Sequence, residues 1–319
     1  MQSNSGKNKR SSLYKLAFVL LAVVLSMALI VGCGNNDDDD SHSESAITGK
    51  TVTTGYGDLK GTATSDVWIW KGIPYAAPPV GNLRWKAPTD PDAWDGVRDA
   101  GQACDECLQQ VYTSQWFPSN AFIGSEDCLY LDIYAPRTED TDLPVYVYIH
   151  GGSGNFDSAK KYDGSALAER GHIIVVYVQY RLNAMGFITH SALRQNGNDL
   201  DDSGNYGLLD IQKALEWVQE NIAAFGGDPD LVTVGGQSAG AHNIMNLIVS
   251  PVTTQFATDL FRGAFMQSVA GPGTMTLSTV SEADARTNTT IDGLLIRNGL
   301  AADATAAVTY RAGMSDFKA

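Results

Sequence analysis

The pattern best suited to covalent chemistry is a GxSxG motif at residues 236–240. A buried strand is expected directly before the motif and a helix directly after it, so Ser238 occupies a sharp strand-to-helix turn. Gly236 and Gly240 leave room for that strained turn, and the helix points its first N–H groups toward developing negative charge. This context predicts that Ser238 is a nucleophile that attacks a carbonyl carbon and forms an acyl-enzyme.

A second glycine-rich segment, residues 150–154 (HGGSG), follows another predicted buried strand. Glycine lets backbone N–H groups approach a tetrahedral intermediate without an intervening side chain. Together with the N–H of Ala239, the residue after the nucleophile, this loop predicts an oxyanion hole. A plain glycine turn is the alternative interpretation of the loop taken alone.

Strands and helices alternate along the chain from about residue 50 onward. Continuous β-branched and aromatic runs at 145–149, 173–177 and 231–234 are typical of strands covered on both faces. Apolar residues spaced by three and four predict a helix over 208–225. Further strands are expected at 51–54, 67–70, 129–134 and 261–269. The alternation predicts an α/β fold with a doubly wound, mostly parallel sheet, preceded by a small antiparallel β region.

Acidic side chains outnumber basic ones, with 36 Asp and Glu against 22 Lys and Arg, which gives a formal net charge of −14. Such a surface repels phosphate backbones, so we expect no nucleic-acid partner. The hydrophobic share of 44% is enough to bury a large core. That share excludes a disordered or fibrous protein.

The amino-terminal residues have the composition of an export signal. Basic residues precede an apolar run at 16–31, which is short for a membrane-spanning helix. The run ends in IVGC, which resembles the lipobox of bacterial lipoproteins, in which the cysteine, here Cys33, is acylated. We expect a signal peptide over 1–32, an acidic flexible tether over 33–47 and a membrane-anchored protein of the cell envelope. An ordinary secretory signal with an incidental cysteine is the alternative.

Export places the other three cysteines in a compartment where disulfides persist. Cys104 and Cys107 form a CxxC pair, but they lie in a predicted polar loop rather than at the start of a helix, which disfavours a redox motif. A bridge between Cys107 and Cys128 would close a loop of about 20 residues and contribute about 3 kcal/mol. The spacing does not fit a zinc site, and no metal is expected.

Five segments of the chain resemble the type B carboxylesterase and cholinesterase family of α/β-hydrolases. They are GIPYAAPPVGNLRWKAP (72–88), SEDCLYLDIYAP (125–136), VYIHGG (147–152), YRLNAMGF (180–187) and GNYGLLDIQKALEWVQENIAAFGGDPDLVTVGGQSAG (204–240). The resemblance implies that residues 48–319 form the N-terminal portion of a carboxylesterase-type domain. It also implies a small-molecule carboxylic ester as substrate and no metal or organic cofactor.

The resemblance assigns roles to individual residues of the site. Ser238 is the nucleophile, and the N–H groups of Gly152, Ser153 and Ala239 form the oxyanion hole. Trp116 lies in the loop where cholinesterases carry a choline-binding tryptophan, and here we expect it to line the substrate pocket or to pack beside it.

The resemblance also implies two structural pairs. One is a disulfide between Cys107 and Cys128, and the other is an ion pair between Arg84 and Glu126. Neither pair takes part in the chemistry, and no partner is implied for Cys104.

The chain departs from the family pattern in three respects. Gln237 stands where an acidic residue usually precedes the nucleophile, and Ser153 replaces the third glycine of the oxyanion loop. The family's acid and histidine follow the serine by well over a hundred residues, whereas the sequence ends at Ala319 with no histidine after His242. We therefore expect both partners beyond residue 319. The elbow turns Ser238 away from the helix that carries His242, which disfavours His242 as the base.

The leading interpretation is an exported, lipid-anchored ester hydrolase represented by its N-terminal part. A non-catalytic binding or adhesion protein on the same scaffold is the alternative, favoured by the missing base and disfavoured by the intact elbow. An inactive gene fragment is a third interpretation. Trp116, Phe117 and Phe122 suggest an aromatic entrance that suits apolar esters.

Overall fold

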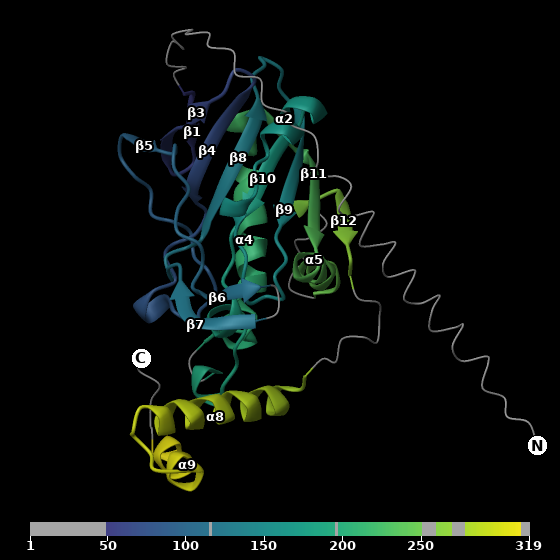
Figure 1. The fold of residues 1–319 in the computed structure, drawn as a ribbon. Helices are drawn as coiled ribbons and strands as arrows, with labels where there is room; N and C mark the ends of the chain where they lie inside the picture. Colours follow the sequence, from purple (N-terminus) through teal and green to yellow (C-terminus); the bar gives the residue numbers. More distant parts are fainter. Residues whose placement is uncertain (1–48, 115–116, 195–196, 251–259, 270–277, 314–319) are drawn as a thin grey trace, which may run out of the picture. The chain divides into compact units, whose positions relative to one another are not determined.

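The computed structural model describes residues 49–114, 117–194, 197–250, 260–269 and 278–313 (Figure 1). These residues belong to a unit that begins at Ala46. The expected signal peptide and tether, with the expected acylation site Cys33, lie outside the described residues, and so does Trp116.

A seven-stranded mixed sheet forms the centre of the fold, in the order β12-β11-β9-β10-β8-β4-β3. Its strands are β3 (Thr62–Ala63), β4 (Val67–Pro74), β8 (Tyr130–Pro136), β9 (Leu143–Ile149), β10 (Ile174–Val178), β11 (Gly227–Gln237) and β12 (Gly263–Gln267). From β10 to β12 neighbouring strands run parallel, and from β10 to β3 they run antiparallel. The predicted α/β fold is confirmed, with a sheet that is parallel on the side that carries Ser238.

Two smaller sheets accompany the central one. In the first, β1 (Thr51–Thr54) pairs antiparallel with β2 (Gly57–Lys60), which pairs parallel with β5 (Val97–Asp99). In the second, β6 (Gln109–Ser114) and β7 (Phe117–Ile123) form an antiparallel pair. The first sheet lies where the sequence predicts a small β region before the main sheet.

Helices cover both faces of the central sheet (Figure 1). Within the described residues the α-helices are α2 (Ser165–Gly171), α3 (Asn183–Gly186), α4 (Tyr206–Asn221), α5 (Ala239–Val249), α8 (Val280–Arg297) and α9 (Ala304–Ala312). Short 3-10 helices are η1 (Gly81–Leu83), η2 (Ala159–Lys161), η3 (Ser191–Arg194), η4 (Asp201–Ser203) and η5 (Ile222–Phe225). Within the described ranges, no helix is long and apolar enough to cross a membrane.

The main hydrophobic core lies between the central sheet and the helices α4 and α5. Ile211, Leu215 and Val218, which belong to the apolar stripe predicted for α4, are fully buried in this core. On the other face of the sheet, Ala168 of α2 packs in a second cluster with Val175 of β10. Because β9 and β11 are fixed between these two layers, the loops at their carboxyl ends are held in a defined position.

Candidate active site

Ser238 lies at the junction of β11 and α5, where the sequence predicts an elbow. Its backbone angles, φ 54° and ψ −120°, lie outside the regions that non-glycine residues prefer, so the turn is strained. The Ser238 N–H donates a hydrogen bond to the carbonyl oxygen of Gln267 in β12 at 2.9 Å. A β-carbon on Gly236 would lie 2.8 Å from the carbonyl carbon of Gly240, which explains why the turn requires glycine at 236.

The glycine-rich loop after β9 runs directly beside Ser238. A β-carbon on Gly151 would lie 3.4 Å from the β-carbon of Ser238. Gly152 and Ser153 both have positive φ, at 88° and 58°. Among the described residues, none accepts a hydrogen bond from the backbone N–H of Gly152, Ser153 or Ala239. These three donors, which the sequence analysis assigns to an oxyanion hole, are therefore available to a ligand beside Ser238.

His150, the first residue of this loop, is buried and has a structural role. Its ring stacks on Tyr180 with 4.5 Å between ring centroids, and the Tyr180 hydroxyl donates to the His150 carbonyl oxygen at 2.9 Å. Burial lowers the pKa of His150 to about 4, so the ring is neutral at pH 7. Since only 1% of the residue is exposed, His150 positions the loop and does not reach a substrate.

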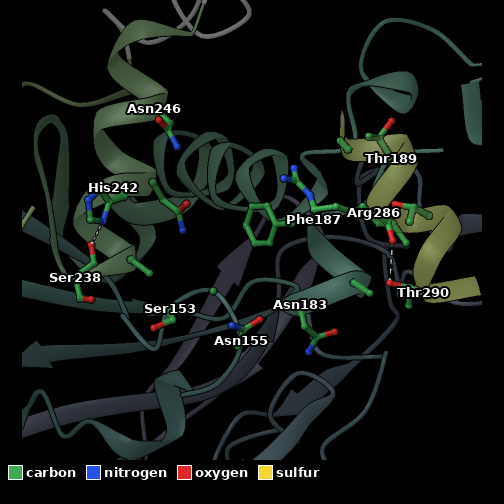
Figure 2. Close-up of a pocket in the computed structure, with 17 residues that line it drawn as sticks. Ser153, Asn155, Asn183, Phe187, Thr189, Ser238, His242, Asn246, Arg286 and Thr290 are labelled. Atoms are coloured by element: carbon green, nitrogen blue, oxygen red, sulfur yellow. Dashed lines mark hydrogen bonds between the residues drawn. The ribbon is translucent and has the colours of Figure 1, made fainter. Parts of the chain in front are cut away.

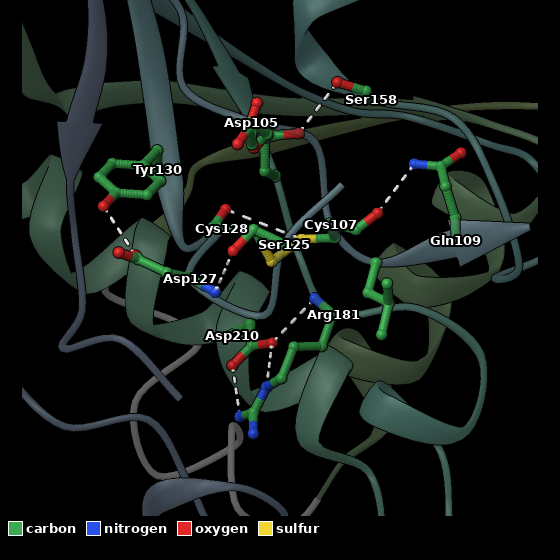
Figure 3. The surroundings of a disulfide bond; sticks show 12 residues. Asp105, Cys107, Gln109, Ser125, Asp127, Cys128, Tyr130, Ser158, Arg181 and Asp210 are labelled. Carbon is green, nitrogen blue, oxygen red and sulfur yellow. Dashed lines mark hydrogen bonds and ion pairs between the residues drawn. A yellow bond between two sulfur atoms is a disulfide. The ribbon is translucent and has the colours of Figure 1, made fainter. Parts of the chain in front are cut away.

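The segment after β10 braces the same loop through contacts that the sequence analysis did not foresee. Arg181 binds Asp210 of α4 with Nε to Oδ2 at 2.8 Å and Nη2 to Oδ1 at 2.7 Å, and both side chains are buried (Figure 3). The Asn183 N–H donates to the carbonyl oxygen of Gly154 at 2.6 Å. Arg181 and Asn183 belong to the YRLN segment and Asp210 belongs to the GNYGLLDIQ segment. A charged residue within an otherwise apolar segment was the sequence signal that could have indicated a buried ion pair.

Both structural pairs implied by the resemblance are present in the fold. Cys107 and Cys128 form a disulfide, with their Cα atoms 5.0 Å apart (Figure 3). Arg84 donates two hydrogen bonds to Glu126, at 2.6 and 2.8 Å. Cys104 is a free thiol, and burial raises its pKa to about 11. Cys104 is therefore protonated at neutral pH, which does not suit a redox motif.

The other histidines of the described residues are His172, His190 and His242. His172 pairs with Asp140 at an exposed position, with 2.8 Å between its Nε2 and the carboxylate. His190 contacts α8. His242 Nδ1 lies 2.9 Å from the carbonyl oxygen of Ser238, so this contact involves the backbone and not the Ser238 hydroxyl. The contact agrees with an elbow that turns the serine away from its own helix.

A cavity of about 700 Å³ opens in front of Ser238 (Figure 2). Most of the described residues that line it are polar. The lining comprises Ser153, Gly154, Asn155, Asn183, Ala184, Phe187, Ile188, Thr189, Ser238, Ala239, His242, Asn243, Asn246, Ala283, Arg286, Thr287 and Thr290. The expected aromatic entrance is not formed by Phe122, which is 65% exposed on β7 and is absent from this lining. The side chains of Trp116 and Phe117 lie outside the described residues.

The described residues hold no cluster of three His, Cys, Asp or Glu side chains that is placed to bind a metal ion.

Comparison with known proteins gives matches over most of the described chain. Residues 48–291 match the model of the Carboxylesterase family. The chain is 46% identical over 232 residues to the para-nitrobenzyl esterase of Bacillus subtilis, and 41% identical over 267 residues to a cocaine esterase of Homo sapiens. These matches cover 70% and 80% of this chain but 44% and 45% of the two relatives, so the chain spans less than half of their length.

The solved structures give the same result. The carboxylesterase EST55 of Geobacillus stearothermophilus aligns with a TM-score of 0.65 and 41% identity. The alignment covers 76% of this chain and 48% of that structure.

Proposed function

The chain belongs to the carboxylesterase family, and we propose that it hydrolyses small-molecule carboxylic esters through an acyl-enzyme on Ser238. One observation carries the proposal: the strained Ser238 lies beside the backbone N–H groups of Gly152, Ser153 and Ala239, which have no acceptor among the described residues. This combination fits a nucleophile with its oxyanion hole.

In the proposed reaction, Ser238 Oγ attacks the ester carbonyl carbon while the hydroxyl proton passes to a general base. The carbonyl electrons move onto oxygen, and the resulting oxyanion accepts hydrogen bonds from the three N–H groups. Collapse of the intermediate breaks the bond to the alcohol oxygen, which takes the proton and leaves. Water then attacks the acyl-enzyme in the same way, which releases the acid and restores Ser238.

The general base is assigned outside the described residues. A serine hydroxyl is a poor nucleophile at neutral pH unless a base accepts its proton. His150 is buried, and the described contact of His242 goes to the Ser238 carbonyl oxygen. In this fold the acid and the histidine follow the nucleophile in the order Ser, acid, His, so the proposal requires a histidine base from outside the described residues.

Labelling with a fluorophosphonate tests the nucleophile. We expect the probe to modify Ser238, identified by mass spectrometry of the labelled peptide, and hydrolysis of p-nitrophenyl acetate to be lost in Ser238→Ala. Ser250→Ala, which changes another serine at the far end of α5, is the matched control and should label normally. Failure of Ser238 to label would favour the alternative, a binding protein on the same scaffold.

We further propose that the protein is exported and anchored in a membrane through an acylated Cys33. The support is the basic segment, the apolar run and the IVGC sequence that ends in Cys33. A disulfide between Cys107 and Cys128 is consistent with an oxidising compartment. Metabolic labelling with an alkyne fatty acid in a bacterial host should mark the protein and fail with Cys33→Ala; equal labelling of both would overturn the anchor.

A further inference from the structure

One wall of the cavity is formed by α8, and this wall carries a cation. Ala283, Arg286, Thr287 and Thr290 of α8 line the same cavity as Ser238. In Figure 2, Arg286 and Ser238 lie on opposite sides of the space. A ligand that fills the cavity therefore contacts the nucleophile at one end and α8 at the other.

Polar contacts hold α8 against the segment before α4. Arg194 donates two hydrogen bonds to Asp284 of α8, at 2.8 and 2.6 Å. His190 Nε2 lies 2.9 Å from Asn288 Oδ1. Hydrogen bonding to Arg194 lowers the pKa of Asp284, so this carboxylate stays ionised and paired with Arg194. It is thus committed to Arg194 and is not the partner of Arg286.

Among the described lining residues, Arg286 is the one Lys or Arg, and none is Asp or Glu. This lining contrasts with the formal net charge of −14 of the whole chain. Glu282 lies four residues before Arg286 on the same helix, and its carboxylate accepts from the Thr279 N–H at 2.8 Å in the capping box of α8. Hydrogen bonds from Thr279, and to a lesser degree the charge of Arg286, lower the pKa of Glu282. Arg286 itself donates to the Ser278 hydroxyl. Since guanidinium carries five N–H donors, most of its hydrogen-bonding capacity remains for a ligand.

We propose that the ester accepted by this cavity carries a carboxylate, which Arg286 binds while the ester carbonyl lies at Ser238. This inference rests on the proposed function, which identifies the ligand group at Ser238 as an ester. A guanidinium matches a carboxylate with two parallel hydrogen bonds, and such charge-assisted pairs are about twice as strong as neutral ones. The substrate class is therefore a half-ester of a dicarboxylic acid, or an equivalent anionic ester, instead of the apolar ester that an aromatic entrance would suit.

Equilibrium binding to the full chain with Ser238→Ala tests the proposal without turnover. The ligands are the monoethyl esters of succinic, glutaric and adipic acid, each compared with its diethyl ester by calorimetry. We expect at least one monoester to bind about ten-fold or more tightly than its neutral diester. Absence of a preference, or of measurable binding by every monoester, would overturn the proposal.

The variant Arg286→Gln should reduce that preference to less than about two-fold, and Arg286→Lys should keep part of it because the charge remains. Arg297→Gln is the matched control, since Arg297 is exposed in the last turn of the same helix and does not line the cavity. An equal loss of the monoester preference in Arg297→Gln would show that the preference depends only on the overall charge of the protein. That result would also overturn the assignment of Arg286 as the carboxylate-binding residue.

The outcome is independent of the test of Ser238. If fluorophosphonate labelling fails while the monoester preference depends on Arg286, the hydrolase proposal falls and the carboxylate site stands. If labelling and hydrolysis succeed with no preference for the monoester, the hydrolase proposal stands and the carboxylate site falls.

Discussion

Gly240 packs against Ile149 so closely that a β-carbon at position 240 would lie 2.1 Å from the Ile149 carbonyl oxygen. Ile149 is the last residue of β9, and the glycine-rich loop follows it directly. Gly240 lies in the first turn of α5, two residues after Ser238. This single approach of two backbones fixes Ser238 relative to the N–H groups of the loop.

Gly240→Ala should therefore displace the elbow from β9. We expect a loss of about 2–4 kcal/mol in the free energy of unfolding, because the obstructing atom belongs to the backbone and cannot rotate away. Fluorophosphonate labelling of Ser238 should fall with it. Urea unfolding followed by circular dichroism measures the stability. Gly293→Ala is the control, since nothing lies within 4 Å of that position on α8 and alanine favours a helix. A Gly240→Ala protein as stable as the parent would contradict this account.

Asp210→Asn should destabilise the protein more than any exposed Asp→Asn change. The substitution leaves the buried Arg181 guanidinium without its counter-charge, which costs about 3–5 kcal/mol. The loop that Arg181 and its neighbours brace should become mobile, so labelling of Ser238 should slow as well. Asp230→Asn, at an exposed position in β11, is the control for unfolding in urea. Similar urea midpoints for Asp210→Asn and Asp230→Asn would show that the ion pair between Arg181 and Asp210 contributes nothing to stability.

Loss of the disulfide should lower stability without removing the site. Replacing Cys107 and Cys128 by alanine opens a covalent loop whose ends are 21 residues apart, which corresponds to about 3 kcal/mol. The melting temperature of the parent should also fall in dithiothreitol, and that of the double variant should not. Cys104→Ala retains the bond and should keep the sensitivity to reductant; insensitivity of the parent to dithiothreitol would refute the prediction.

Asp132→Asn should stabilise the protein at neutral pH and leave it unchanged in acid. Burial raises the pKa of Asp132 from 3.8 to about 6, although the Gly72 N–H and Lys71 act in the opposite direction. The folded state thus favours the protonated form, a contribution that is complete below pH 3.8 and is lost as the pH rises through 6. Asparagine keeps an acceptor for Gly72 and removes the charge. We expect a gain of up to about 3 kcal/mol at pH 7.5 and none at pH 3.5.

Urea unfolding at the two pH values measures this difference. Asp92→Asn, at an exposed position, is the matched control and should show no such dependence. A stability difference between Asp132→Asn and the parent that is the same at both pH values would show that the charge of Asp132 is not the cause.

The elements that carry local signals were predictable from the sequence. The strand expected at 51–54 is β1, and the run at 231–234 is the central part of β11. The turn at Ser238 followed from its glycines, because no other residue type leaves room for two backbones at that spacing. These features depend on neighbours in the sequence, so a single chain contains the information.

The supporting contacts were not predictable in the same way. Arg181 and Asp210 are 29 residues apart, and nothing in either segment identifies the other as its partner. The position of Arg286 depends on how α8 docks, although the capping box at Thr279 and Glu282 is a local signal for the start of that helix. Such contacts are decided by the packing of the whole fold, which periodicity and spacing do not encode.

The two ends of the cavity differ in how firmly the chain holds them. The elbow and its loop are fixed by backbone contacts in a buried sheet, whereas only Thr287 and Leu295 of the 18 residues in α8 are buried. Arg194 and His190 connect that helix to the body through polar contacts. Substitutions in α8 can therefore accumulate during evolution at small cost in stability, so the ligand preference of that end of the cavity can change while Ser238 and its loop are inherited unchanged.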